Sequence, residues 1–167
     1  MRTKLEYTIR EIRPGEIGIL EDMLYEAIFQ EDESNPLPKD VIKQPELSVY
    51  IDSFGKKDDF CYVVEVNGGI AGAVWVRILT GEIKGYGNLD NQTPEFAISL
   101  YRKYRNQGMG TALMREMIER LKAEGYRQAS LSVAKDNYAV KMYQKLGFQI
   151  IEEQDNDYLM LLPLNMV

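Results

Sequence analysis

The residues best suited to chemistry in this sequence are two glycines, Gly108 and Gly110, in the stretch YRNQGMGTALM (104–114). They follow Arg105 and precede a segment with helical periodicity. The start of a helix carries unpaired backbone N–H groups and a partial positive charge, and glycine lets a phosphate approach these groups closely. The pattern predicts a phosphate-binding loop. The alternative is a helix start at which glycine serves only a steric need.

Two familiar phosphate motifs do not fit this stretch. The Walker loop requires a lysine directly after its second glycine, and no lysine follows either glycine here. The dinucleotide fingerprint G-x-G-x-x-G requires a third small residue at position 113, which is Leu113. A nucleotide kinase, an ATPase of the Walker type and a dinucleotide-binding domain are therefore not expected.

The content of histidine and cysteine narrows the chemistry further. The chain of 167 residues has no histidine, which excludes Ser–His and Cys–His triads and histidine-based zinc sites. Its one cysteine, Cys61, begins the apolar run CYVVEV, so a disulfide framework is excluded and a buried structural thiol is favoured over a nucleophile. Acid–base chemistry must then use carboxylates, tyrosine, lysine, the backbone or water, and we expect no metal site.

The charge balance bears on the partners of the protein. A net charge of -6 argues against a nucleic-acid surface or an anionic membrane surface and favours an amine-bearing partner, although ordinary acidic solubility explains it equally well. The opening MRTKLEYTIREI lacks the apolar core of a signal peptide, and no run of 18 apolar residues occurs. We therefore expect a cytoplasmic protein that binds neither nucleic acid nor membrane.

The first half of the chain reads as a strand, one or two helices and a hairpin. Residues 7–11 alternate as a strand does, and Pro14 and Gly15 then break the pattern. Apolar residues at helical spacing predict a helix over 16–30, and a shorter helix is expected over 41–54, which Pro45 splits or delays. The run FCYVVEVNGGIAGAVWVRIL predicts two antiparallel strands that turn at Asn67 and Gly68.

The second half reads as strand, helix, strand, helix and two strands. A strand over TPEFAISLY (93–101) places Phe96, Ile98 and Leu100 on one face and Glu95, Ala97 and Ser99 on the other. A helix follows from Met109 and ends at Gly125, and QASLSVA is the next strand. Asp136 is expected to cap a helix that Gly147 closes, before the last strands FQIIEE and YLMLLPL. The segment 94–134 is long enough for a parallel crossover, so we expect one mixed α/β (α+β) domain over residues 1–167.

Two stretches together resemble the signatures of one family. YRNQGMGTALM matches the R-x-x-G-x-G/A pattern of the GNAT superfamily of acetyl-CoA-dependent N-acetyltransferases, and DNYAVKMYQKLGF is similar to its second signature, an alanine, a tyrosine four residues later and a Gly-Phe beyond. The first half matches the family by its order of elements rather than by its residues. The resemblance implies a central mixed, mostly antiparallel sheet of about seven strands, with a parallel strand–helix–strand in the second half and helices on both faces.

The resemblance also implies where acetyl-CoA, the cosubstrate, binds. Its pantetheine arm is expected along the main chain of Ile98 and Leu100. The family has an asparagine seven residues before the tyrosine, where this chain has Asp136 followed by Asn137, so that contact falls on one of the two or is replaced by a helix cap. The pyrophosphate is expected on the loop residues Arg105, Asn106, Gln107, Gly108, Met109, Gly110 and Thr111.

Two side chains are implied in the chemistry. Tyr143 matches the tyrosine that donates a proton to the departing thiolate, and the alternative is an ordinary core aromatic. Glu95 is the candidate base, directly or through water, and the alternative is a solvated residue at a strand start. The main-chain N–H of Leu100 or of a neighbour is the expected oxyanion donor.

The resulting functional hypothesis is an N-acetyltransferase that acetylates a primary amine of a small molecule, peptide or protein by direct attack of the amine on the thioester. A non-catalytic GNAT-like module that binds an acyl-CoA as a sensor or scaffold is the alternative. The acidic first helix with its loop FQEDESNPLPKD (29–40) and the segment TGEIKGYGNLDNQ (80–92) are expected to border the substrate cleft, and a homodimer is possible.

Overall fold

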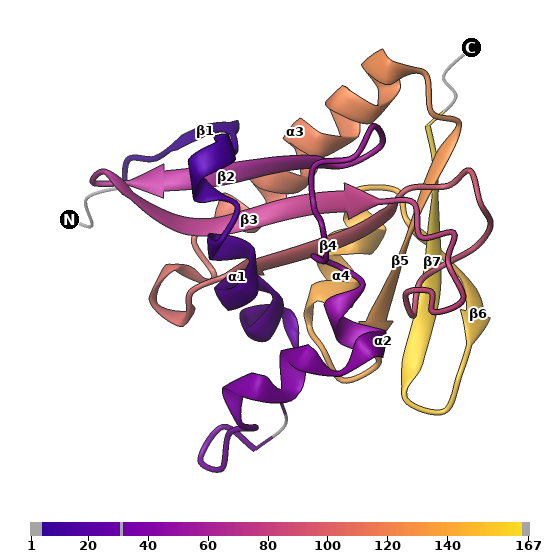
Figure 1. Cartoon of the computed structure of the whole chain (residues 1–167), viewed down its shortest axis with the longest axis horizontal. Coiled ribbons are helices and arrows are strands. Elements are labelled where there is room, and N and C mark those ends of the chain that lie inside the picture. Colours follow the sequence, from indigo (N-terminus) through magenta and orange to yellow (C-terminus); the bar gives the residue numbers. More distant parts are fainter. Residues whose placement is uncertain (1–4, 31, 165–167) are drawn as a thin grey trace.

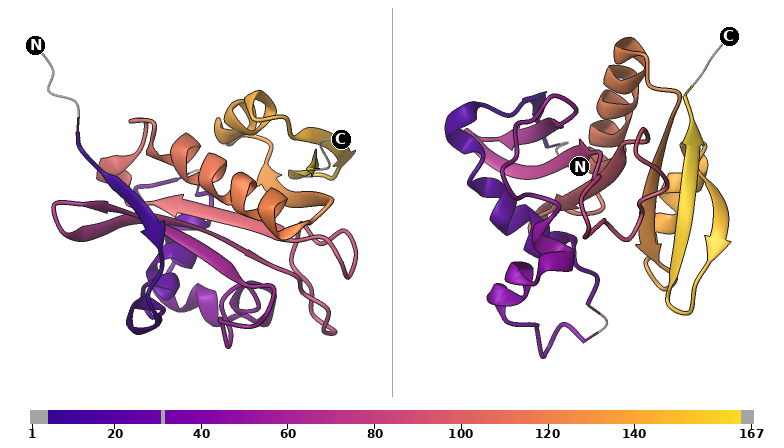
Figure 2. Two further views of the ribbon diagram at one scale, coloured as in Figure 1. Left: turned by 90° about the horizontal axis from the view of Figure 1, so that it is seen from above. Right: turned by 45° about the vertical axis from the view of Figure 1, so that its right-hand side comes forward.

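The computed structural model describes residues 5–30 and 32–164, which form a seven-stranded sheet with helices on both faces (Figures 1 and 2). The strand order is β1-β2-β3-β4-β5-β7-β6, and every neighbouring pair is antiparallel except β4 and β5. The predicted fold class is therefore confirmed. The strands are β1 (Thr8–Glu11), β2 (Phe60–Val66), β3 (Gly69–Arg77), β4 (Glu95–Leu100), β5 (Gln128–Ala134), β6 (Gln149–Glu153) and β7 (Asp157–Pro163). The α-helices are α1 (Ile19–Ala27), α2 (Pro45–Ser48), α3 (Met109–Glu124) and α4 (Ala139–Lys145).

The hairpin of β2 and β3 forms where the sequence predicts it. Asn67 and Gly68 both have positive φ angles, 51° and 82°, as a two-residue type I′ turn requires. Side chains alternate between the two faces along these strands, and helices cover both faces. Both strands can therefore be apolar almost throughout.

One hydrophobic core lies between the sheet and α3 with α4, and a second lies between the sheet and α1 with the residues after α2. On α3, Met109, Leu113, Met117 and Leu121 are fully buried, as their spacing predicts. The second core gathers around Trp75, which is also fully buried. Cys61 belongs to this core, and burial raises the pKa of its thiol, so it is a structural thiol and not a nucleophile.

Strand β4 connects the two cores. Phe96 is part of the core under α3, and Ile98 and Leu100 pack against it. On the other face, the Ser99 hydroxyl donates a hydrogen bond to the Met23 carbonyl of α1 at 2.6 Å. The predicted alternation of side chains along this strand is confirmed.

Three local predictions need correction. The helix predicted over 16–30 is shorter, because α1 begins at Ile19 after a 3-10 turn and Ile28 is already extended, with ψ 119°. The helix predicted over 41–54 is divided into a 3-10 turn over Lys39–Lys43 and the short helix α2. Pro45 is the first residue of α2, a position at which proline is tolerated. Asp136 does not cap α4, since the N–H of Ala139 bonds to the side-chain oxygen of Asn137 at 2.9 Å.

Within the described residues, no helix is both long enough and apolar enough to cross a membrane.

A buried ion pair fixes the chain after α2 against the sheet. The Arg77 guanidinium pairs with Asp59 at 3.0 Å, and both side chains are about 5% exposed. Arg77 also donates to the carbonyls of Val49 and Asp52 at 2.9 and 2.7 Å, and the indole N–H of Trp75 donates to the Tyr50 carbonyl at 3.1 Å. Residues 49–52 are thus held by β3.

We predict that Arg77→Met lowers the free energy of unfolding by about 3–5 kcal/mol, because it leaves the Asp59 carboxylate and two carbonyls buried without their partner. Lys135→Met, which breaks an ion pair with the exposed Glu153, is the control and should cost less than about 1 kcal/mol. Urea unfolding measures both values. Equal losses in the two variants would contradict this role of Arg77.

Candidate active site

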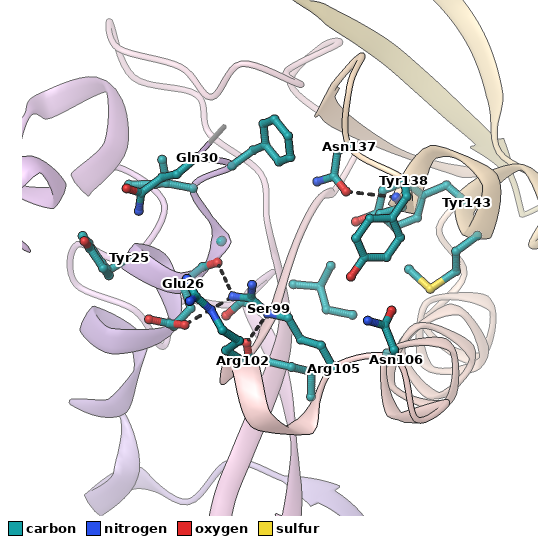
Figure 3. A pocket seen from close by; sticks show the side chains of 18 of the residues that line it. Tyr25, Glu26, Gln30, Ser99, Arg102, Arg105, Asn106, Asn137, Tyr138 and Tyr143 are labelled. Carbon is teal, nitrogen blue, oxygen red and sulfur yellow. Dashed lines mark hydrogen bonds and ion pairs between the residues drawn. The ribbon is translucent and has the colours of Figure 1, made fainter. Parts of the chain in front are cut away.

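A pocket of about 460 Å³ opens where β4 and β5 move apart. These two strands pair in parallel at a single position, Glu95 with Ser130, and are not paired beyond it. The pocket is lined by the end of β4, the turn before α3, the start of α4, and the end of α1 with the residues after it (Figure 3). Its volume is in the range of small-molecule sites.

The glycine turn presents the N-terminus of α3 to the pocket. Gly108 precedes the helix in a left-handed conformation, with φ 88°, and no side chain caps the helix. The first-turn N–H groups of a helix have no partner within it, so this turn offers them to an anion. Gly110 needs no glycine for steric reasons, since a Cβ there would meet Leu100 and Met142 at ordinary distances of 3.7 and 3.8 Å.

Arg105 bridges two walls of the pocket. Its Nε donates to the Leu100 carbonyl at 2.9 Å, and its Nη2 lies 3.3 Å from both the carbonyl and the carboxylate of Glu26. The side chain therefore ties the end of β4 to the end of α1, a role that its place in the sequence motif did not suggest.

Tyr143 enters the pocket from α4. It is 7% exposed and packs edge-on against Phe148, with ring centroids 5.9 Å apart. Burial raises the pKa of the phenol, so the hydroxyl is protonated at neutral pH. No described residue forms a hydrogen bond with this hydroxyl, which leaves it available to a bound molecule.

Glu95 lies at the closed end of the gap, outside the pocket lining. It is 3% exposed, and its Oε2 accepts hydrogen bonds from the Tyr50 hydroxyl and, at 2.9 Å, from the Gly87 N–H. Its Oε1 has no partner among the described residues. Burial raises the carboxyl pKa to about 7, against the opposing effect of the two hydrogen bonds. The alternative of a solvated strand-start residue is therefore wrong.

Most of the predicted cofactor residues lie together in the pocket. Gln107 instead donates its side-chain amide to the Lys103 carbonyl at 3.0 Å, Met109 has its side chain in the core, and Asp136 is exposed outside the lining. The residues brought together are Ile98, Leu100, Arg105, Asn106, Gly108, Gly110, Thr111, Asn137 and Tyr143.

The sequence motifs named no residue of the wall formed by α1, although the acidic first helix and its loop were expected to border the cleft. In Figure 3, Tyr25, Glu26 and Gln30 face Asn137 and Tyr138 across the pocket. The acidic character of the first helix and of the segment 29–40 was the signal for this wall, whereas no residue of 80–92 lines the pocket. No group of three or more histidine, cysteine, aspartate or glutamate side chains in residues 5–30 and 32–164 is arranged to hold a metal ion.

Comparison with known proteins gives one family. The model of the Acetyltransferase (GNAT) family matches residues 23–148, which is more than half of the chain. Among solved structures, the fold is similar to an acetyltransferase of the GNAT family from Streptococcus pneumoniae, with a TM-score of 0.68, 25% identity and coverage of 96% of this chain and 100% of that one.

Relatives in sequence are also acetyltransferases. An N-alpha-acetyltransferase of Sulfurisphaera tokodaii is 30% identical over 117 residues, which are 62% of this chain and 68% of that protein. A mycothiol acetyltransferase of Corynebacterium glutamicum is 36% identical over 76 residues, 42% of this chain. The matched region spans only 26% of the mycothiol acetyltransferase.

The buried Glu95 carboxyl predicts a specific dependence of stability on pH. Its pKa rises on folding from 4.5 to about 7, so the folded chain keeps this proton while the unfolded chain loses it. The free energy of unfolding should therefore fall as the pH rises between these values. Relative to Glu95→Gln, the wild type should be about 2–3 kcal/mol less stable at pH 8 than at pH 5. Urea unfolding of both proteins at both pH values measures this, and a constant difference would contradict it.

Proposed function

Because this chain belongs to the acetyltransferase (GNAT) family, we propose that it transfers the acetyl group of acetyl-CoA to a primary amine. The observation that carries the proposal is one pocket in which an uncapped helix N-terminus, the separated edge of β4 and the buried phenol of Tyr143 come together. The first feature suits a pyrophosphate, the second an amide-containing arm, and the third a leaving thiolate.

The residues at the pocket fit acetyl-CoA as a substrate. We assign the pyrophosphate to the main-chain N–H groups of the turn 105–111, and the pantetheine arm to the main chain of Ile98 and Leu100. Asn137 replaces Asp136 in our assignment, because Asn137 lines the pocket and Asp136 does not. Arg105 contributes mainly by holding the end of β4, since its guanidinium already binds Leu100 and Glu26.

The proton balance of the reaction assigns a role to each titratable group. An acceptor ammonium first loses a proton to Glu95, directly or through water, and the neutral amine attacks the thioester carbonyl. The C–S bond breaks, and the thiolate takes a proton from Tyr143. The nitrogen, which must lose a second proton to become an amide, gives that proton to the tyrosinate and so restores Tyr143. Glu95 releases its proton to solvent. The products are the amide, CoA and one proton.

The acceptor is a primary amine of a small molecule, a peptide or a protein. The sequence relatives are named for different acceptors, so their names do not select one. A non-catalytic acyl-CoA sensor is not favoured, because such a module has no need for a buried phenol in the pocket and a carboxyl of pKa about 7 at the end of the same gap. A cytoplasmic location is part of this proposal.

The cofactor site is tested with two glycines at opposite ends of α3. Gly108 and Gly125 both have left-handed backbones, with φ 88° and 90°, and open space where a Cβ would lie. Replacing either with leucine should cost about 1–2 kcal/mol of stability. Acetyl-CoA and CoA at 100 times their Kd should raise the Tm of wild type and Gly125→Leu by about 5–10 °C, because binding stabilises the folded state.

Gly108→Leu should lose this shift, because its side chain enters the phosphate turn, and ATP should shift none of the three proteins. Calorimetric scans with each ligand measure the shifts. A Gly108→Leu protein that still responds to both CoA species would contradict the assignment of the turn. No response of the wild type to either would count against the proposed function itself.

Tyr143→Phe tests the proton donor. The change keeps the ring that packs against Phe148 and removes only the hydroxyl. We expect kcat for acetyl transfer to fall about 100-fold or more, with the Tm shift by acetyl-CoA unchanged. Tyr158→Phe, a partly buried tyrosine outside the pocket, is the control. Release of CoA in the presence of L-phenylalanine, an Ala-Ala-Ala peptide or 1,5-diaminopentane measures turnover, and unchanged kcat would remove Tyr143 from the mechanism.

A further inference from the structure

The buried carboxylate of Glu95 is held by a residue far from it in the sequence. The Tyr50 hydroxyl donates to Glu95 Oε2 and accepts a hydrogen bond from the Tyr86 N–H at 2.7 Å. The main chain around Tyr50 is itself fixed by Trp75 and Arg77 from β3. The Tyr50 side chain is therefore fixed at both ends, at its main chain and at its hydroxyl.

The segment after β3 covers the carboxylate with glycines. A Cβ on Gly85 would come within 2.3 Å of Glu95 Oε1, and one on Gly87 would come within 3.0 Å of Oε2. Gly87 is buried and donates its N–H to Oε2, whereas Gly85 is partly exposed. Gly85 therefore packs directly against the unpartnered Oε1, which is itself buried, and any side chain at this position would displace it.

The gap between the strands is also open next to Glu95. Two residues beyond the Glu95–Ser130 pair lie Ala97 on β4 and Ser132 on β5, and both are partly exposed although they are in the middle of the sheet. Ala97 points to the same face of β4 as Glu95. The pocket begins one residue further, at Ile98, so about 10 Å of strand separates Glu95 from it, a distance that a chain of about three waters can bridge.

We propose that Tyr50 is a positioning residue that holds Glu95 as the proton acceptor for the amine, and that Gly85, which has no side chain, leaves Oε1 in place to take that proton. The proposal rests on the proposed function. The proton passes from the acceptor ammonium through water to Oε1, which turns the carboxylate into a carboxylic acid, and the amine nitrogen keeps the electron pair with which it attacks. Tyr50 keeps its own proton throughout.

Among the described residues, Tyr50 supplies the only side-chain hydrogen bond to Glu95. Arg77 lies opposite Glu95 on β3, but its guanidinium is directed to Asp59 and to the carbonyls of Val49 and Asp52. From the other neighbouring elements, Gly87 contributes its N–H and β5 contributes the uncharged Ser130 and Ser132. Burial raises the pKa of Glu95, and the hydrogen bonds from Tyr50 and Gly87 lower it.

The proposal is tested first by titration, which needs no acceptor. The side-chain carboxyl of Glu95 is followed by ¹³C NMR as the pH changes, with Glu95→Gln to assign the signal. We expect a pKa near 7 in the wild type and a rise of about one unit in Tyr50→Phe, because the hydrogen bond that stabilises the carboxylate is lost. Tyr126→Phe, which removes a tyrosine hydrogen bond to Asp58 elsewhere, should leave the Glu95 signal unchanged.

The second measurement is the pH profile of kcat/KM with acetyl-CoA and the three amine probes named above. The acid limb should shift to higher pH by the same unit in Tyr50→Phe, and Gly85→Ala should lose about tenfold or more in kcat with its acetyl-CoA Tm shift intact. A merely structural Tyr50 would lower stability without moving the profile or the Glu95 titration.

The outcomes separate this inference from the proposed function. An active wild type with the same acid limb and the same Glu95 titration in Tyr50→Phe overturns the inference alone. A wild type that acetylates none of the probes and does not bind acetyl-CoA counts against the proposed function. A Glu95 carboxyl that titrates near 4.5 in the wild type overturns the inference whatever the activity.

Discussion

The early end of the pairing between β4 and β5 is the constraint on which the rest of the site depends. After the single pair of Glu95 and Ser130, the two strands no longer bond to each other, so their facing backbone N–H and C=O groups need other partners, as the Leu100 carbonyl has in Arg105. Such groups are costly when they are left unpaired away from water, so a gap in the middle of a sheet persists where a ligand or water satisfies them. The crossover helix α3 starts just after β4, and this places its free N–H groups at the mouth of the same gap (Figure 2).

At Glu95, the stability of the fold and the chemistry of the site have opposite requirements. Burial of its carboxyl makes the folded chain less stable at neutral pH, and the same burial brings its pKa to about 7, where a carboxylate can accept a proton from an ammonium. The ion pair of Arg77 with Asp59 and the indole bond of Trp75 stabilise the chain beneath this group. A carboxyl that is exposed to water would not need these stabilising contacts beneath it. Its pKa would stay near the ordinary value, so it would be a weak base at neutral pH.

The sequence predicted correctly those features that depend on a few neighbouring residues. The turn at Asn67–Gly68, the alternation along β4 and the glycine turn before α3 each depend on a few neighbouring residues, and all appear as expected. Some errors are local, such as the division of the predicted helix at Pro45 and the cap on Asn137 in place of Asp136, and others come from contacts with separate segments. The Tyr25 hydroxyl and the Gln30 side chain bond to the main chain of Leu37, on the segment that leaves α1. The burial of Glu95 likewise depends on Tyr50, 45 residues away, and no periodicity in β4 could indicate it.

The alternation of β4 also explains why the proposed proton donor and the proposed proton acceptor come from different layers. Glu95 lies toward the α1 side with Tyr50, whereas Tyr143 belongs to the core under α3 and α4. In a continuous sheet, the hydrogen-bonded strands would separate two such groups. Where β4 and β5 are apart, a thioester in the plane of the sheet can be approached by an amine from one face while its leaving sulfur is protonated from the other. Direct transfer without a covalent enzyme intermediate requires both groups at one carbonyl carbon, and the gap in the sheet gives access to that carbon from both layers.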